Sequence, residues 1–126
     1  MLDGICLGNL MIDCDDEKNL CMFYEKLLGW KRDILYGHPA LCSNAGLVLL
    51  FMEDADYIPP VWPEEKDKQQ KQMHFDFQVP DVSAAVAYAQ TLGARKAPQQ
   101  FGGTDFVTML DPAGHPFCLC DMNNEV

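Results

Sequence analysis

The chain has 126 residues, of which 48% are hydrophobic and 22% charged, and its formal net charge is −10. A chain of this size and composition is typical of one globular domain that buries a core without disulfides or metal ions. Its apolar runs are too short to span a bilayer, and the acidic balance without a Lys/Arg stripe argues against nucleic-acid binding.

The N-terminal stretch, residues 1 to 16, has no basic segment before its apolar residues, so it does not resemble a secretory signal. We therefore expect a cytoplasmic protein with no membrane partner. Within this stretch, residues 8 to 14 predict a first strand.

Residues 16 to 28 have a clear helical period. The apolar positions that repeat at helical spacing are Leu20, Phe23, Tyr24, Leu27 and Leu28. Asp15 or Asp16 suits the N-cap, and Gly29 suits the C-terminal stop. Strand signals follow at residues 30–35, 39–43 and 46–52.

Residues 54 to 72 are rich in proline and charge and predict a linker. Long loops are often functional, so Trp62 is a candidate cap over a ligand. An aromatic side chain that only anchors a surface linker is the alternative.

A second set of elements follows the linker. Residues 73 to 79 alternate strictly, with Phe75 and Phe77 on one face and His74 and Asp76 on the other. Residues 81 to 92 predict a second helix, and strand signals follow at 95–99, 104–110 and 116–120.

The two halves repeat each other. Asn9 precedes Asp16 by seven residues, and His74 precedes Asp81 by seven. The pattern is βαβββ twice, which predicts a single α+β domain over 1–126. Its parts are a first module at about 1–53, the linker at about 54–72, and a second module at about 73–126.

The six cysteines form no Cys-x-x-Cys pair, and several lie inside apolar periodic segments. In a reducing compartment such cysteines behave as small buried hydrophobes rather than as a disulfide framework or a zinc site.

Three stretches together resemble the vicinal oxygen chelate superfamily, which includes glyoxalases, bleomycin-resistance proteins and extradiol dioxygenases. The resemblance is strongest to the glyoxalase-like domains of that superfamily. The stretches are CDDEKNLCMFYEKLLGW (14–30), HFDFQVPDVSAAVAYAQTLGA (74–94) and DPAGHPFCLC (111–120). The resemblance implies two tandem modules that form an open, curved mixed sheet around a cavity, with the helices outside. It also implies a homodimer.

Metal-dependent members of that superfamily take ligands from the first and last strands of each module. The corresponding positions here are Asn9, Leu50, His74 and Cys118, of which only His74 is an unchanged ligand type. A hard divalent ion needs oxygen or imidazole donors. We therefore expect no metal, no cofactor and no glyoxalase I-type isomerase reaction. A register shift that brings Glu53 toward the cavity would reopen the question.

The residues expected to line the cavity and bind a ligand are Asn9, Asp13, Leu50, Trp62, His74, Asp76 and Cys118. His74, adjusted by Asp76, is either a ligand-binding or acid–base imidazole or a histidine retained from a metal-binding ancestor. Cys118 and Cys120 share a strand face, and the strand pairing that the resemblance implies places Cys118 near His74. A Cys–His pair can activate a thiolate, but inert lining of an apolar pocket is the alternative.

Two functions follow from these residues. The leading one is a glyoxalase-like protein with a degenerate metal site that binds a small organic molecule, for sequestration or resistance. The alternative is a lyase, isomerase or dioxygenase-type enzyme that uses an atypical metal set or the Cys118/His74 pair. No catalytic residue is assigned, and the ligand is not specified by the sequence.

Overall fold

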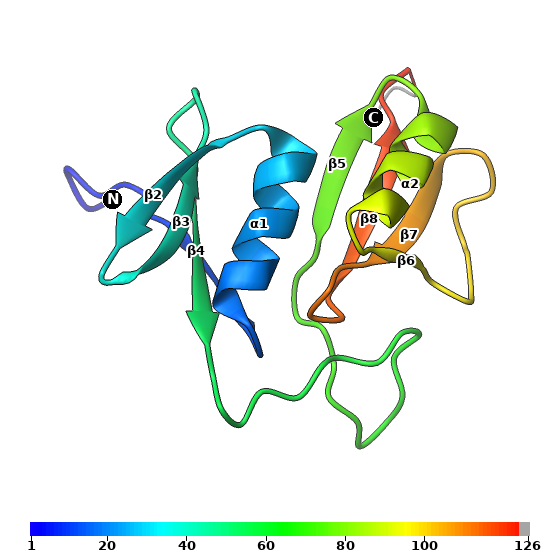
Figure 1. The fold of residues 1–126 in the computed structure, drawn as a ribbon, viewed down its shortest axis with the longest axis horizontal. Coiled ribbons are helices and arrows are strands. Elements are labelled where there is room, and N and C mark those ends of the chain that lie inside the picture. Colours follow the sequence, from blue (N-terminus) through cyan, green and yellow to red (C-terminus); the bar gives the residue numbers. More distant parts are fainter. Residues whose placement is uncertain (124–126) are drawn as a thin grey trace. The chain divides into compact units, whose positions relative to one another are not determined.

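The computed structural model describes residues 1–123 and divides into two compact units, Met1–Tyr57 and Ile58–Val126 (Figure 1). Each unit contains one βαβββ module. The second unit also takes in most of the predicted linker.

The first unit follows the predicted order of elements. Its elements are β1 (Leu10–Cys14), α1 (Glu17–Leu28), β2 (Lys31–Leu35), β3 (His38–Cys42) and β4 (Val48–Glu53). The strands form one sheet in the order β1-β4-β3-β2, with β1 parallel to β4 and the other pairs antiparallel.

Helix α1 begins and ends where the sequence predicts. The Asp16 side chain accepts a hydrogen bond from the backbone N–H of Asn19 at 3.1 Å, which identifies Asp16 rather than Asp15 as the N-cap. Gly29 ends the helix with φ of 68°, a left-handed conformation that glycine adopts without strain.

The core of this unit lies between α1 and its sheet. Tyr24 of α1 stacks on Phe51 of β4, with ring centroids 5.9 Å apart, and both side chains are fully buried. A buried aromatic pair of this kind adds to the stabilisation given by apolar area alone. The helical stripe predicted from the spacing of apolar residues therefore faces the sheet.

The second unit repeats the arrangement. Its elements are β5 (Phe75–Val79), α2 (Val82–Thr91), β6 (Arg95–Lys96), β7 (Phe106–Leu110) and β8 (Pro116–Asp121). The strand order is β5-β8-β7-β6, with β5 parallel to β8 and the other pairs antiparallel. Helix α2 packs against β6, β7 and β8.

Most strands are shorter than the sequence suggests, β5 and β6 among them. Strand β5 begins at Phe75 and leaves His74 just before it. Strand β6 has only two residues, and just beyond it the Ala97 N–H donates to the Thr108 carbonyl at 3.0 Å. The side chain of Gln100 takes over part of the pairing: its Nε2 donates to the carbonyls of Ala97 and Thr108, and its Oε1 accepts from the Thr108 N–H, each at 2.8 Å.

The Asp-Pro-x-Gly segment forms the tight turn before β8. The buried Asp111 carboxylate accepts hydrogen bonds from the backbone N–H groups of Ala113 and His115, at 2.9 and 3.0 Å. Gly114 has φ of 89°. The turn packs against Pro59, so this part of the linker belongs to the second unit.

The fold class is α+β, with two tandem modules whose strands form two open four-stranded sheets. Within residues 1–123, neither helix has the length and apolar character needed to cross a membrane.

Candidate functional site

Alternation along β5 separates an apolar from a polar face. Phe77 packs edge-to-face on Phe117 of β8, with ring centroids 5.9 Å apart. The ring centroids of Phe75 and Phe77 are 5.4 Å apart. Since successive residues of a strand point to opposite faces, Asp76 projects from the other side of the sheet. The alternation predicted from the sequence is therefore confirmed.

Strand register brings a thiol to the same face. Asp76 is the partner of Cys118 in the parallel pair of β5 and β8, and Thr108 of β7 is the partner of Cys118 on its other side. The hydroxyl of Thr108 and the Cys118 Sγ share a hydrogen bond of 3.4 Å. The thiol is thus held in the middle of the sheet between a hydroxyl and a carboxylate.

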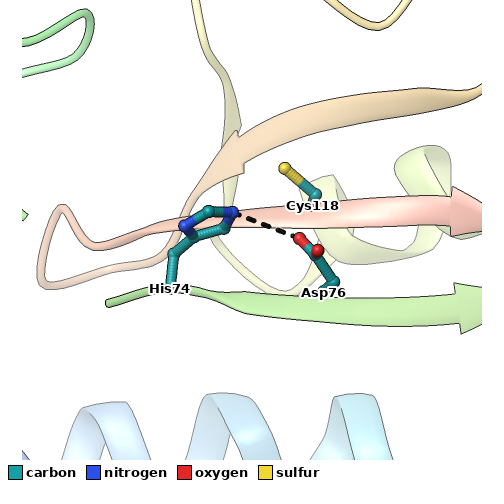
Figure 2. A group of neighbouring side chains, drawn as sticks. All are labelled: His74, Asp76 and Cys118. Carbon is teal, nitrogen blue, oxygen red and sulfur yellow. Dashed lines mark ion pairs between the residues drawn. The ribbon is translucent and has the colours of Figure 1, made fainter. Parts of the chain in front are cut away.

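His74 completes a cluster of three polar side chains, shown in Figure 2. Its Nε2 lies 3.2 Å from Oδ1 of Asp76. One ligand atom from each of His74, Asp76 and Cys118 lies within 4.8 Å of the others. The sequence-based expectation that Cys118 lies near His74, and His74 beside Asp76, is confirmed.

The cluster has an accessible and a buried side. The side chains of His74 and Asp76 are 34% and 63% exposed, whereas Cys118 is only 5% exposed. Burial raises the pKa of the Cys118 thiol; the hydrogen bond with Thr108 lowers it, and the neighbouring Asp76 carboxylate raises it. The thiol is therefore neutral near pH 7 unless a cation joins the cluster.

Trp62, the candidate cap, lies against a loop of the second unit. Its indole N–H donates to the carbonyl of Gln99 at 3.2 Å, and its ring packs edge-to-face on Phe101 at 5.9 Å. The ammonium group of Lys71 lies 5.1 Å from the ring centroid, a cation–π contact. Lys71 also pairs with Glu64. These contacts hold the linker in place, and ligand capping by Trp62 stays a prediction.

Three of the predicted site residues belong to the first unit. Asn9 immediately precedes β1, Asp13 is exposed on β1, and Leu50 is fully buried on β4. In register, Leu50 lies between Met11 of β1 and Ala40 of β3. Their role in ligand binding stays a prediction.

Two neighbours of the cluster were not identified from the sequence. Thr108 contacts Cys118, and Lys71 acts through its positive charge to lower the pKa of Cys118. An antiparallel register between residues 104–110 and 116–120 would have revealed Thr108, but sequence alone does not fix that register. The same register places Phe106, opposite Cys120, on the thiol-bearing face.

The residues at the superfamily's four metal positions do not fit that superfamily's metal site. Leu50 is a buried hydrocarbon with no donor atom, and Asn9 offers only a neutral amide. Cys118 offers a soft sulfur where hard ions prefer oxygen. His74 alone matches, so the four positions taken together carry no metal-dependent chemistry of the superfamily's kind.

Comparison with solved structures shows the fold. A glyoxalase/bleomycin resistance protein/dioxygenase family enzyme from Burkholderia phytofirmans superposes with a TM-score of 0.69 at 14% identity, over 93% of this chain and 98% of that one. A possible glyoxalase from Bacillus cereus gives 0.66 at 16%, over 93% and 99%. The trypanothione-dependent glyoxalase I of Leishmania major gives 0.61 at 17%, over 95% and 88%.

Sequence comparison identifies the family. No curated protein matches the chain by sequence. The family model of the glyoxalase-like domain matches residues 9–120, which include both modules. The chain therefore belongs to the glyoxalase-like domain family.

Proposed function

We propose that this protein binds a small organic molecule on the polar face of the second sheet, in a sequestering or resistance-type role. The observation that carries the proposal is the grouping of His74, Asp76 and Cys118 on one sheet face. A few convergent polar groups beside apolar surface are the usual composition of a small-molecule site.

The chemistry of this face suits recognition. Asp76 and His74 provide exposed hydrogen-bonding groups, and Phe106 provides apolar surface in register with Cys120. The carboxylate also favours a ligand that carries a positive charge or a hydrogen-bond donor. The proposed ligand-binding set on this sheet face is His74, Asp76 and Cys118, with Thr108 and Phe106 added. Ligand binding by the other four residues predicted from the sequence stays a prediction.

The experiment is a thermal-shift screen of small organic compounds in buffer that contains a chelator, so that the protein face is tested alone. We expect at least one compound to give a saturable shift that is lost in both His74→Ala and Asp76→Ala. Ser83→Ala, at an exposed position of α2, is the matched control and should keep the shift. Compounds that bind all variants equally, or the absence of any saturable binder, would contradict the proposal.

A cysteine-dependent enzyme is the second candidate, favoured by the proximity of His74 to Cys118. The raised pKa of the Cys118 thiol opposes it, because the thiolate is the nucleophile. His74 moreover pairs with Asp76. Iodoacetamide labelling near pH 7 separates the two candidates: an enzyme of this type requires Cys118 to react faster than the exposed Cys6, and we expect it to react more slowly.

For the assembly we propose a homodimer, as the family resemblance implies. Exposed apolar side chains support it, since Leu2, Ile5 and Ile34 are 70%, 70% and 72% exposed. Light scattering after size-exclusion chromatography should give twice the chain mass of 14.2 kDa, and a monomer mass at micromolar concentration would contradict a stable dimer.

A cytoplasmic location is also part of the proposal. The described residues include six free cysteines, two of which are fully buried, and such thiols persist in a reducing compartment. Fractionation of cells that express the full chain tests this location.

A further inference from the structure

The second module brings together three donor atoms, and only two of them come from the superfamily's metal positions. His74 and Cys118 lie at such positions, but Asp76 lies two residues further along the chain and contributes a carboxylate. All three ligand atoms come from one module. Imidazole nitrogen, thiolate sulfur and one carboxylate oxygen are the donors that zinc accepts in proteins.

We propose that His74, Asp76 and Cys118, the side chains proposed above to bind an organic molecule, also bind a zinc ion within the second module. This replaces the sequence-based expectation that no metal binds, which considered only the four superfamily positions. The set leaves one of zinc's four coordination positions for water.

The geometry needs little adjustment. Tetrahedral zinc with bonds of about 2.0–2.3 Å places its ligand atoms about 3.3–3.7 Å apart. His74 Nε2 and Asp76 Oδ1 are already 3.2 Å apart, and no pair exceeds 4.8 Å. The remaining gap of at most about 1.5 Å is within reach of side-chain rotation, since the side chains of His74 and Asp76 are both accessible.

The surroundings of the thiol also suit a bound cation. Asp76 and Cys118 are fixed opposite each other by the register of β5 and β8, so the carboxylate and the thiol project from the same face of the sheet. Zinc would displace the proton of the thiol, which passes to solvent, and the thiolate sulfur would become the ligand. The Thr108 hydroxyl, 3.4 Å from that sulfur, would then orient it by a hydrogen bond.

The chemistry selects against hard ions. Magnesium and calcium take oxygen ligands, and this cluster offers one carboxylate beside a nitrogen and a sulfur. Soft sulfur and borderline imidazole favour zinc, or cobalt(II) as its spectroscopic substitute. The proposal therefore predicts binding of zinc and cobalt(II), and no competition from millimolar magnesium.

The test is titration of the full chain, carrying Cys6→Ser to remove an exposed thiol, with zinc alone and with cobalt(II) alone. We expect one equivalent of zinc by calorimetry and a thiolate-to-cobalt charge-transfer absorption that zinc abolishes. Loss of an outer-shell partner typically weakens metal binding about 10- to 100-fold. Loss of a direct ligand should weaken zinc binding at least as much. Cys118→Ala should meet this expectation and also lose the charge-transfer band.

Two further variants keep the proposal falsifiable. Asp76→Asn changes an exposed side chain without threatening the fold, and should weaken zinc binding at least about tenfold. Cys120→Ala, which removes the neighbouring thiol on the same strand, should leave zinc binding unchanged. Zinc binding that survives in Cys118→Ala, disappears in Cys120→Ala, or is absent from the Cys6→Ser chain would overturn the proposal. None of these results affects the ligand screen, which contains a chelator.

Discussion

Asp76 and Cys118 lie directly opposite each other on the parallel strands β5 and β8. The carboxylate and the thiol therefore share one face of the second sheet, with His74 Nε2 3.2 Å from the carboxylate. This pairing decides the character of the site. It provides a second and a third donor beside the single imidazole that remains at the superfamily's metal positions.

The pH dependence of stability should reveal the buried thiol of Cys14. Burial raises the pKa of Cys14 from its usual 9.0 to about 12, and its Sγ hydrogen bonds to the carbonyl of Met52. The fold thus favours the neutral thiol. Its contribution to stability is complete below pH 9.0 and is lost as the pH rises toward 12.

Cys14→Ala tests this sign. At pH about 7.5 the variant should be less stable by about 1–2 kcal/mol in urea unfolding, and the difference should shrink by pH about 10.5. A difference that stays constant between the two pH values would show that the thiol does not titrate as described. Cys6→Ala, at an exposed thiol, should show no such trend.

Loss of the Asp111 carboxylate should destabilise the second unit. Asp111→Ala leaves the N–H groups of Ala113 and His115 without their acceptor, at an expected loss of about 2–3 kcal/mol in the free energy of unfolding. Asp111→Asn is the matched control, because it keeps the accepting oxygen and should lose less than half as much. Equal losses in both variants would contradict the role of the hydrogen bonds.

Gln100 should matter more than its exposed neighbour Gln99. Its side chain makes three hydrogen bonds to the backbone of Ala97 and Thr108, in place of a longer β6. We expect Gln100→Ala to lose about 1–3 kcal/mol in chemical unfolding and Gln99→Ala to lose less than about 0.5 kcal/mol. The same loss in both variants would show that the hydrogen bonds of the Gln100 side chain do not stabilise the fold in place of a longer β6.

Two glycines with nearly the same φ angle allow the cost of backbone strain to be distinguished from the cost of a steric clash. Gly46 and Gly114 have φ of 88° and 89°, but a Cβ at Gly46 meets nothing within 4 Å, whereas one at Gly114 lies 3.0 Å from Cβ of Pro59. Gly46→Ala should lose about 1 kcal/mol, and Gly114→Ala should lose more. Thermal unfolding of both variants tests the difference, and an equal loss would mean that Pro59 yields freely.

The periodic elements were predictable because local physics fixes them. Asp16, one of the two N-cap candidates, caps α1, and Asp81 caps α2, since a short acidic side chain before an apolar stripe satisfies exposed N–H groups. The ends of β5 and β6 were not, because they depend on pairing with distant strands. In register His74 falls opposite Pro116, which has no N–H to donate.

The site was predictable only in part. Period-two alternation correctly grouped His74 with Asp76, and the family resemblance correctly placed Cys118 near them. The contact of Thr108 with Cys118 and the suitability of Asp76 as a third donor depend on strand register, which no single-sequence pattern determines. For this reason the sequence favoured a site without metal, whereas the proposal of zinc rests on the three donors that the register brings together.

Elemental analysis by mass spectrometry of the full chain, purified without chelator from zinc-supplemented medium, tests the central claim most directly. The account predicts close to one zinc per chain in the parent and in Cys120→Ala, and little in Cys118→Ala. A parent protein free of zinc, or zinc retained at the same level in Cys118→Ala, would contradict it.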